Sequence, residues 1–234
     1  MWVAGVDGCR GGWICVSRNT RTGETRFARV DRTRELLDLV PQPEILCVDI
    51  PIGLADRGGR ECDRLARVLL GRPRASSVFP APIRPALEAA DREEASRITA
   101  RIDGRRVPSQ AFGLFAKIRA MDELLRANPA ARERIREVHP ELSFWAWNGR
   151  QAIREGKKTR AGKQSRLRLV EAWLGPGVLA AARVGSRRSE LADDDILDAA
   201  AVLWTATRIA DGTARILPDG PRRDATGLRM EIVY

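Results

Sequence analysis

The sequence predicts an α/β fold in which a mixed five-stranded sheet is flanked by helices. Three short apolar runs joined by tight turns open the chain, and after one helical segment a fourth run shows no polar alternation. Farther along, helical segments alternate with one more short strand. We expect a single domain over residues 1–234, with a helical insertion at roughly residues 57–130.

The first three strands are expected to form an antiparallel meander. Residues 2–7 are apolar and end in Asp7, the turn at 8–12 is rich in glycine, and residues 13–17 are again apolar. A second turn contains Gly23, and residues 25–30 then complete the meander.

A crossover then leads to a buried strand. Residues 31–39 are predicted to be a helix that Asp31 caps and Pro41 ends. Residues 44–50 lack alternation, which indicates a strand buried on both faces. A helical crossover lets this strand pair in parallel with the first one. This order is that of a ribonuclease H-like fold.

The rest of the chain adds mainly helices. A loop rich in proline and serine is expected at 72–85, a short strand at 134–138, and a strand-like end at 227–234. The predicted helices cover residues 60–70, 86–102, 110–125, 160–174 and 190–211.

Composition limits the function classes without choosing one. The net charge is +10, and of the 41 lysines and arginines only four are lysines. The charge indicates either a surface that attracts nucleic acid or a general bias toward arginine. No apolar run is long enough for a membrane span, and the start does not resemble a signal peptide, so we expect a cytoplasmic protein without a membrane partner. The four cysteines are expected to be reduced and structural.

Several acids occur in apolar segments, where an ionised carboxylate requires a partner or a metal ion. Asp7 ends the first strand, Asp49 lies in the buried strand, Glu141 stands between apolar residues, and Asp198 interrupts a helix that is apolar nearly all round. Asp195 precedes Asp198 by three residues and can share its helix face. Each acid alone is also compatible with a turn or cap. Together they favour a site for hard divalent cations.

Short motifs along the chain resemble the DUF429 family of predicted ribonuclease H-like nucleases. The motifs are Gly5-Val6-Asp7-Gly8-Cys9-Arg10-Gly11-Gly12-Trp13, Asp49-Ile50-Pro51-Ile52-Gly53-Leu54, Arg60-Glu61-Cys62-Asp63, Ser76-Ser77-Val78-Phe79, His139-Pro140-Glu141, Lys157-Lys158-Thr159, Asp194-Asp195-Ile196-Leu197-Asp198-Ala199 and the segment from Gly227 to Ile232. The last aspartate motif is also similar to that of Holliday-junction resolvases.

The resemblance implies that acids from the first strand, the fourth strand and a C-terminal helix bind metal. These acids are Asp7, Asp49 and Asp195 or Asp198. Glu141 belongs to the family's own His-Pro-Glu motif, and we include it among the candidate catalytic residues.

The resulting hypothesis is hydrolysis of nucleic acid phosphodiesters with two Mg²⁺ or Mn²⁺ ions, bridged by Asp7. Arg10, Lys157 and Lys158 are candidate phosphate donors, although an exposed turn arginine and a solvated lysine pair fit the sequence equally well. His139 is either a proton shuttle or a structural turn residue.

Two other functions remain open. One is an ATP-binding phosphotransferase of the actin and sugar-kinase type, in which the glycines at 8–12 would hold phosphates. The chain is short for such a protein, and it lacks a second glycine-rich loop near its C-terminus. The other is a non-catalytic protein that binds nucleic acid through its positive charge.

Overall fold

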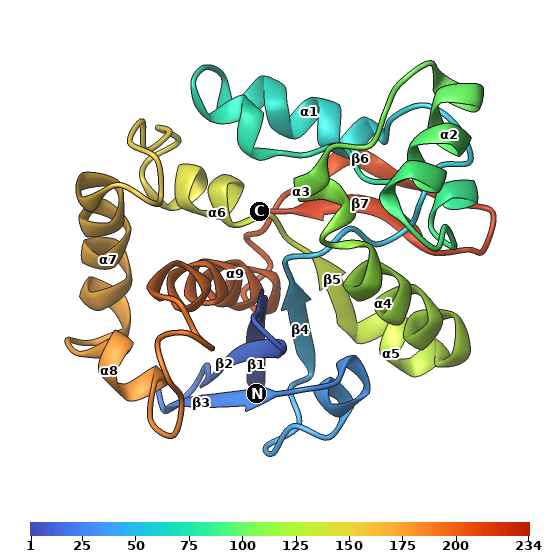
Figure 1. The fold of residues 1–234 in the computed structure, drawn as a ribbon. Helices are drawn as coiled ribbons and strands as arrows, with labels where there is room; N and C mark the ends of the chain where they lie inside the picture. The colour runs from blue at the N-terminus through green and yellow to red at the C-terminus, as the bar shows by residue number, and fades with distance from the viewer.

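Five strands form the central sheet in the computed structural model, which describes residues 1–220 and 222–234 in full (Figure 1). The meander consists of β1 (Trp2–Cys9), β2 (Gly12–Asn19) and β3 (Thr25–Val30), all antiparallel. β4 (Ile45–Val48) pairs in parallel with β1, and β5 (Ile135–Glu137) in parallel with β4. The resulting order, β3-β2-β1-β4-β5, confirms the predicted mixed sheet and is consistent with a ribonuclease H-like fold.

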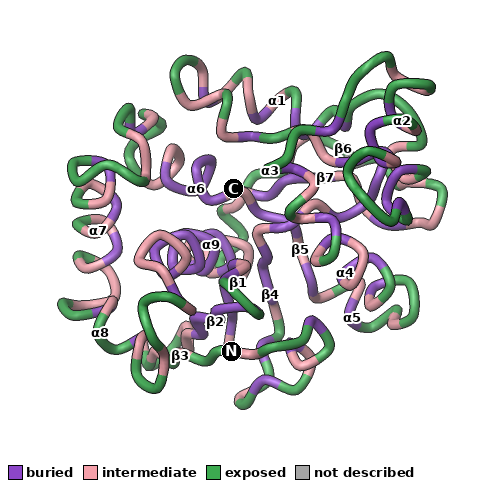
Figure 2. The backbone as a smooth tube through the Cα atoms, in the orientation of Figure 1, coloured by how far each residue is buried: buried purple, intermediate pink, exposed green. Residues whose placement is uncertain are grey.

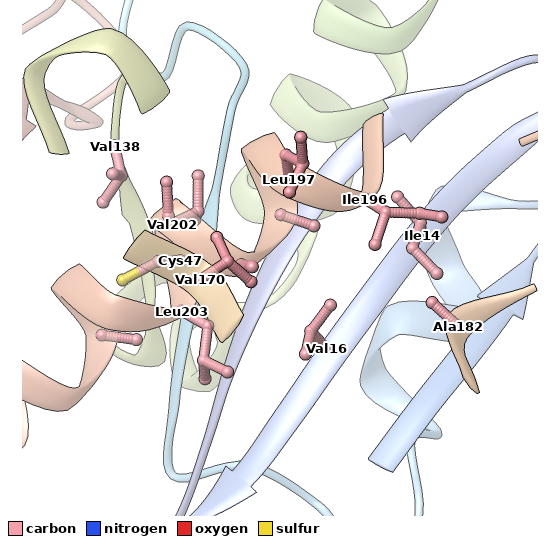
Figure 3. Packing of buried hydrophobic residues seen from close by; sticks show 14 of the residues in the cluster. Ile14, Val16, Cys47, Val138, Val170, Ala182, Ile196, Leu197, Val202 and Leu203 are labelled. Atoms are coloured by element: carbon pink, nitrogen blue, oxygen red, sulfur yellow. The ribbon is translucent and has the colours of Figure 1, made fainter. Parts of the chain in front are cut away.

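Helix α9 (Asp193–Ala210) packs directly on one face of this sheet. Its apolar side chains meet Ile14 and Val16 of β2 and Cys47 of β4 (Figure 3). The approach is close because Gly5 has no side chain: a Cβ there would overlap the backbone of Ala199 and Leu203. α6 (Pro140–Trp147), α7 (Arg160–Leu174) and α8 (Val178–Ala182) complete this layer; α7 and α8 carry exposed residues, whereas α6 is buried or intermediate throughout (Figure 2).

The other face of the sheet is covered by α4 (Phe115–Ala127). Ile118, Met121 and Leu125 of this helix belong to the same buried cluster as Val6 and Val48. Successive side chains of a strand point to opposite faces. Along β1 and β4, every second side chain therefore packs against α9, and the side chains between them pack against α4.

In the sequence, the remaining elements lie mainly between β4 and β5 and at the C-terminus. A second, two-stranded sheet joins the end of β5 through a bridge between Val138 and Val233. These elements are α1 (Glu61–Leu70), α2 (Arg92–Asp103), α3 (Ser109–Phe112), α5 (Pro129–Arg134), β6 (Ile216–Arg223) and β7 (Arg229–Val233), with short 3-10 helices at Thr33–Leu37, Arg74–Ser77 and Arg84–Ala86.

Three predicted helices are wrong in extent. The segment 31–39 forms only the 3-10 helix Thr33–Leu37, and the side chain of Glu35, rather than Asp31, accepts from the backbone at its start. The helix expected at 86–102 begins at Arg92, because the side chain of Asp91 accepts from the backbone N–H of Glu94 and that of Glu94 accepts from the backbone N–H of Ala90. The helix expected at 110–125 is broken at Gly113 and Leu114 into α3 and α4.

Other predictions about the chain can also be compared with the structure. α1, α7 and α9 match their predicted positions closely, whereas α6 and β6 were not predicted. All four cysteines are free and buried, as expected. None of the helices among the described residues has the length and apolar character needed to cross a membrane.

Candidate functional site

Three aspartates from distant parts of the chain meet at the carboxyl end of the central strands. Asp7 lies two residues beyond Gly5 on β1, so the alternation of the strand turns it toward α9. Asp49 lies two residues beyond Cys47, which packs on the same helix. Asp198 projects from α9 and is only 2% exposed. The register of the strands thus directs both strand acids toward the helix acid.

The acids are close enough to repel one another. Burial, followed by the charges of Asp49 and Asp198, holds the pKa of Asp7 well above its usual range. Burial and the charge of Asp198 raise the pKa of Asp49 to about 8. Burial raises the pKa of Asp198 to about 6, although Lys157 opposes that shift. A site in which acids retain protons so readily is short of positive charge.

Lys157 supplies the one direct ion pair to these three aspartates among the described residues. Its Nζ lies 2.6 Å from Oδ2 of Asp198; burial acts to lower its pKa, but the carboxylates of Asp198, Asp7 and Asp49 outweigh burial and raise it. The other oxygen of Asp198, Oδ1, is buried and has no hydrogen-bond partner. The site therefore retains an acceptor oxygen that the protein leaves unsatisfied.

Asp195 lies close to the other acids but has a structural role as well. Its side chain accepts from the backbone N–H of Ala192 at 3.1 Å and so caps its own helix. Burial raises its pKa despite this bond, and its charge contributes to the raised pKa of Asp7. Asp195 thus borders the three aspartates.

Lys117 approaches the site from α4 and was not predicted. Its Nζ donates to the carbonyl oxygens of Gly12 at 2.6 Å and of Cys9 at 3.3 Å, and it lies over the ring of Trp13. Burial lowers its pKa, whereas the charges of Cys9, Asp7 and Asp195 raise it. Only four lysines occur in the chain, and this rarity could have marked Lys117 as a candidate site residue in the sequence.

Glu141 is held in a buried ion pair. Nη2 of Arg166 lies 2.7 Å and 2.9 Å from its two carboxylate oxygens, and Nη2 of Arg74 lies 3.0 Å from Oε1. Arg166, which is 1% exposed, also donates to the carbonyl oxygens of Glu155 and Gly162. Glu141 thereby helps to fix the segment that leads to Lys157.

A second buried network fixes the loop after Asp49. Glu137 accepts from the backbone N–H of Ile52 at 2.6 Å and from Arg60 through both oxygens. Arg60 also pairs with Asp63 at 2.6 Å and donates to the carbonyl oxygen of Ile52 at 2.9 Å. Neither Arg60 nor Glu137 was a predicted site residue. Their contacts link β5 and α1 to the loop that begins at Asp49.

The remaining predicted residues lie at the margin of the site. Arg10 is exposed in the turn between β1 and β2, and Lys158 adjoins Lys157 without an ion pair within the described chain. His139 follows β5, and its Nε2 is 3.3 Å from the carbonyl oxygen of Ser77. Burial lowers the pKa of His139, and its Nδ1 has no hydrogen-bond partner.

The donor set suits a hard divalent cation. The acids supply only oxygen ligands, Asp198 has an orphaned buried oxygen, and the raised pKa values of the acids mark a need for positive charge. In the described part of the chain no three His, Cys, Asp or Glu side chains are arranged as a ready-made metal-binding group. Ligation therefore requires the carboxylates to draw together around the ion.

Comparison with known proteins identifies a family but no activity. One family model, described as "Protein of unknown function (DUF429)", matches residues 5–223. Neither the curated proteins nor the solved structures include a significant match to the chain. The matched region contains Asp7, Asp49 and Asp198, together with both lysines of the site.

Proposed function

The chain belongs to the DUF429 family, whose description assigns no function, and we propose that it is a metal-dependent nuclease that hydrolyses phosphodiester bonds of nucleic acid. The observation that carries this proposal is the convergence of Asp7, Asp49 and Asp198, with one lysine paired to them. Three buried acids share one ammonium group, and a divalent cation would take the place of the protons that the acids otherwise retain.

Asp7, Asp49 and Asp198 are the proposed ligands, with Asp195 at the edge of the site. Mg²⁺ or Mn²⁺ bound there would supply Lewis acidity for an attacking water and for the leaving oxygen. Asp7 lies on β1, the strand next to β4, and the charges of both Asp49 and Asp198 raise its pKa. We assign to Asp7 the role of an acid that would bridge two ions.

Lys157 and Lys117 add the positive charge of side chains to that of the metal ions, and each has its own role. Lys157 holds Asp198 at 2.6 Å, and its side chain remains 38% exposed. A phosphate that enters from solvent can therefore reach the same ammonium group. Lys117 is tied to the turn between β1 and β2 through Cys9 and Gly12, and so it orients the backbone next to Asp7. We assign phosphate binding to Lys157 and positioning of the turn to Lys117.

Calorimetric titration of Mg²⁺ and Mn²⁺ into the wild type, Asp7→Asn and Asp49→Asn tests the metal site directly. We expect binding to the wild type and none to either variant. The matched control is Asp56→Asn, an exposed acid shortly after the same strand that has no ion pair among the described residues. Equal binding to all four proteins would place the metal elsewhere and would contradict the proposal.

The activity is tested with single-stranded, duplex and branched DNA and RNA, with and without EDTA. Cleavage that requires metal, Asp7 and Asp49 is the expected result. No metal-dependent cleavage of any substrate would refute the nuclease proposal. In that case, thermal stabilisation by ATP would favour the phosphotransferase alternative.

A further inference from the structure

A stack of aromatic rings extends from the core toward the surface on the side of α6 and α9. Phe144, which is fully buried, lies parallel to Trp147 with their ring centroids 6.2 Å apart, and Trp147 lies parallel to Trp204 at 5.1 Å. The guanidinium of Arg208 lies 4.8 Å from the centroid of Trp204, one helical turn farther along α9. Trp173 of α7 meets Trp147 edge-on at 5.5 Å.

Arginines without acidic partners surround the outer end of this stack. Burial and the nearby charges of Arg150 and Arg215 lower the pKa of Arg208. Arg150 and Arg215 are exposed, and the described residues place no carboxylate within salt-bridge distance of any of the three. The charge of Tyr234 offsets part of this effect at Arg208, and the remaining positive charge favours a bound anion.

These features together fit a single strand of nucleic acid. Bases stack on tryptophan and on the planes of arginine side chains, while neighbouring arginines hold the phosphates. A duplex hides its base faces inside its own stack and cannot use such a platform. We propose that the surface formed by Trp147, Trp204, Arg150, Arg208 and Arg215 binds single-stranded nucleic acid.

The position of this surface connects it to the carboxylate site. The loop 148–159 begins next to Trp147 and carries Lys157 near its other end. An open hollow of about 300 Å³ lies along it, between Asn148 and residues 151–155 of the loop and Ser165 and Leu169 of α7. A strand whose base stacks on the guanidinium of Arg208, over Trp204, can continue along this hollow beside the loop that carries Lys157. In this role the inference rests on the proposed nuclease function, and it assigns single strands as the substrate class.

Fluorescence anisotropy of a labelled oligothymidine strand in EDTA measures binding without cleavage. The test variant combines Arg150→Asn, Arg208→Gln and Arg215→Gln; asparagine suits the positive φ of 63° at position 150. The control combines Arg92→Gln, Arg97→Gln and Arg101→Gln, which removes equal charge from the exposed side of α2. Only the test variant should bind the strand more weakly, by about tenfold or more. The slope of log affinity against log salt concentration should also become shallower by about 2 in this variant.

Three results would overturn the inference. Equal weakening by both triple variants would show that only net charge matters. Equal binding of a duplex would exclude base stacking as the basis of recognition. Equally tight and equally arginine-dependent binding of polyglutamate would indicate an acidic protein as the partner instead.

The stack itself is tested by tryptophan fluorescence. Oligothymidine should quench the emission of the wild type, and Trp204→Phe should remove most of this quenching. Trp2→Phe is the control, because Trp2 also lies under an arginine, Arg26 at 5.1 Å, on another edge of the molecule. A loss of quenching in Trp2→Phe and not in Trp204→Phe would contradict the assignment.

Cleavage assays separate this inference from the proposed function. If the wild type cleaves nucleic acid but the test variant binds and cleaves as well as the control variant, the surface assignment fails and the nuclease proposal stands. If the test variant loses binding while the wild type cleaves nothing, the surface assignment stands and the nuclease proposal fails.

Discussion

Lys157 and Asp198 form an ion pair of 2.6 Å at the centre of the carboxylate site, and Oδ1 of the same aspartate has no partner. The lysine thus provides one positive charge where three acids meet. Because charge compensation is incomplete, the site should respond strongly both to the loss of this lysine and to an added cation.

Lys157→Met should destabilise the protein in EDTA by about 1–3 kcal/mol, a reduced value for a pair whose lysine is partly exposed. Mg²⁺ should recover more stability in this variant than in the wild type, because the ion replaces the missing charge. Thermal unfolding with EDTA and with Mg²⁺ measures both effects. Lys158→Met, next in sequence and without an ion pair within the described chain, should change neither; a similar loss there would contradict a specific role for Lys157.

Asp49 should make stability depend on pH. Its pKa is about 8 in the folded protein and 3.8 in its ordinary state, so the folded site keeps a proton that the unfolded chain releases. Stability from this group is complete below about pH 4 and is lost as the pH rises through about 8. In EDTA, Asp49→Asn should therefore be more stable than the wild type at pH 8, by about 1–3 kcal/mol.

Urea unfolding of both proteins between pH 4 and pH 8 measures this difference. The gap between Asp49→Asn and the wild type should close toward the acidic end, where Asp49 is protonated in both states. The free energy of unfolding of Asp56→Asn should change with pH in the same way as that of the wild type. A gap that stays constant with pH would show that Asp49 is already ionised in the folded site.

The three aspartates could be predicted from the sequence because each interrupts an apolar segment. The strand alternation also places Asp7 and Asp49 on the face that α9 covers. Lys117 could not be predicted in the same way, because it lies 108 residues from Cys9 and reaches the turn only through the packing of α4. Arg166 was equally hidden, since nothing local distinguishes it from the many other arginines.

The errors in the fold have similar physical causes. α6 is apolar on almost all sides, so it shows no helical periodicity, and Pro140 at its start suggests a turn. β6 contains Pro218 and Gly220, which are typical of loops, and it is a strand only because β7 pairs with it around an irregular register. Tertiary contacts thus determine both elements.

Gly5 should be essential for the carboxylate site, although it carries no functional group. A Cβ at this position would overlap backbone atoms of Ala199 and Leu203, which no rotamer change can relieve. Gly5→Ala should therefore push α9 away from β1, destabilise the fold by about 3 kcal/mol or more, and weaken metal binding through Asp198. Thermal unfolding and calorimetry measure the two effects. Gly59→Ala, which meets open space, is the matched control, and equal behaviour of both variants would contradict the close packing.

Glu141 should behave differently from the three aspartates, because both of its oxygens are bound by Arg166 and Arg74. Glu141→Gln leaves the buried guanidinium of Arg166 without its counter-charge and should cost about 3–5 kcal/mol. Asp198→Asn removes one of three acids that share a single lysine, so it should cost far less in EDTA while abolishing metal binding.

Urea unfolding in EDTA and calorimetry with Mn²⁺ distinguish the two roles. Below its own unfolding transition, Glu141→Gln should still bind metal, with an affinity reduced by about tenfold or less, because it acts through the segment that carries Lys157. Loss of metal binding at unchanged stability in Glu141→Gln would instead make Glu141 a ligand. That result would require Arg166 to release a carboxylate that it now holds at 2.7 Å and 2.9 Å.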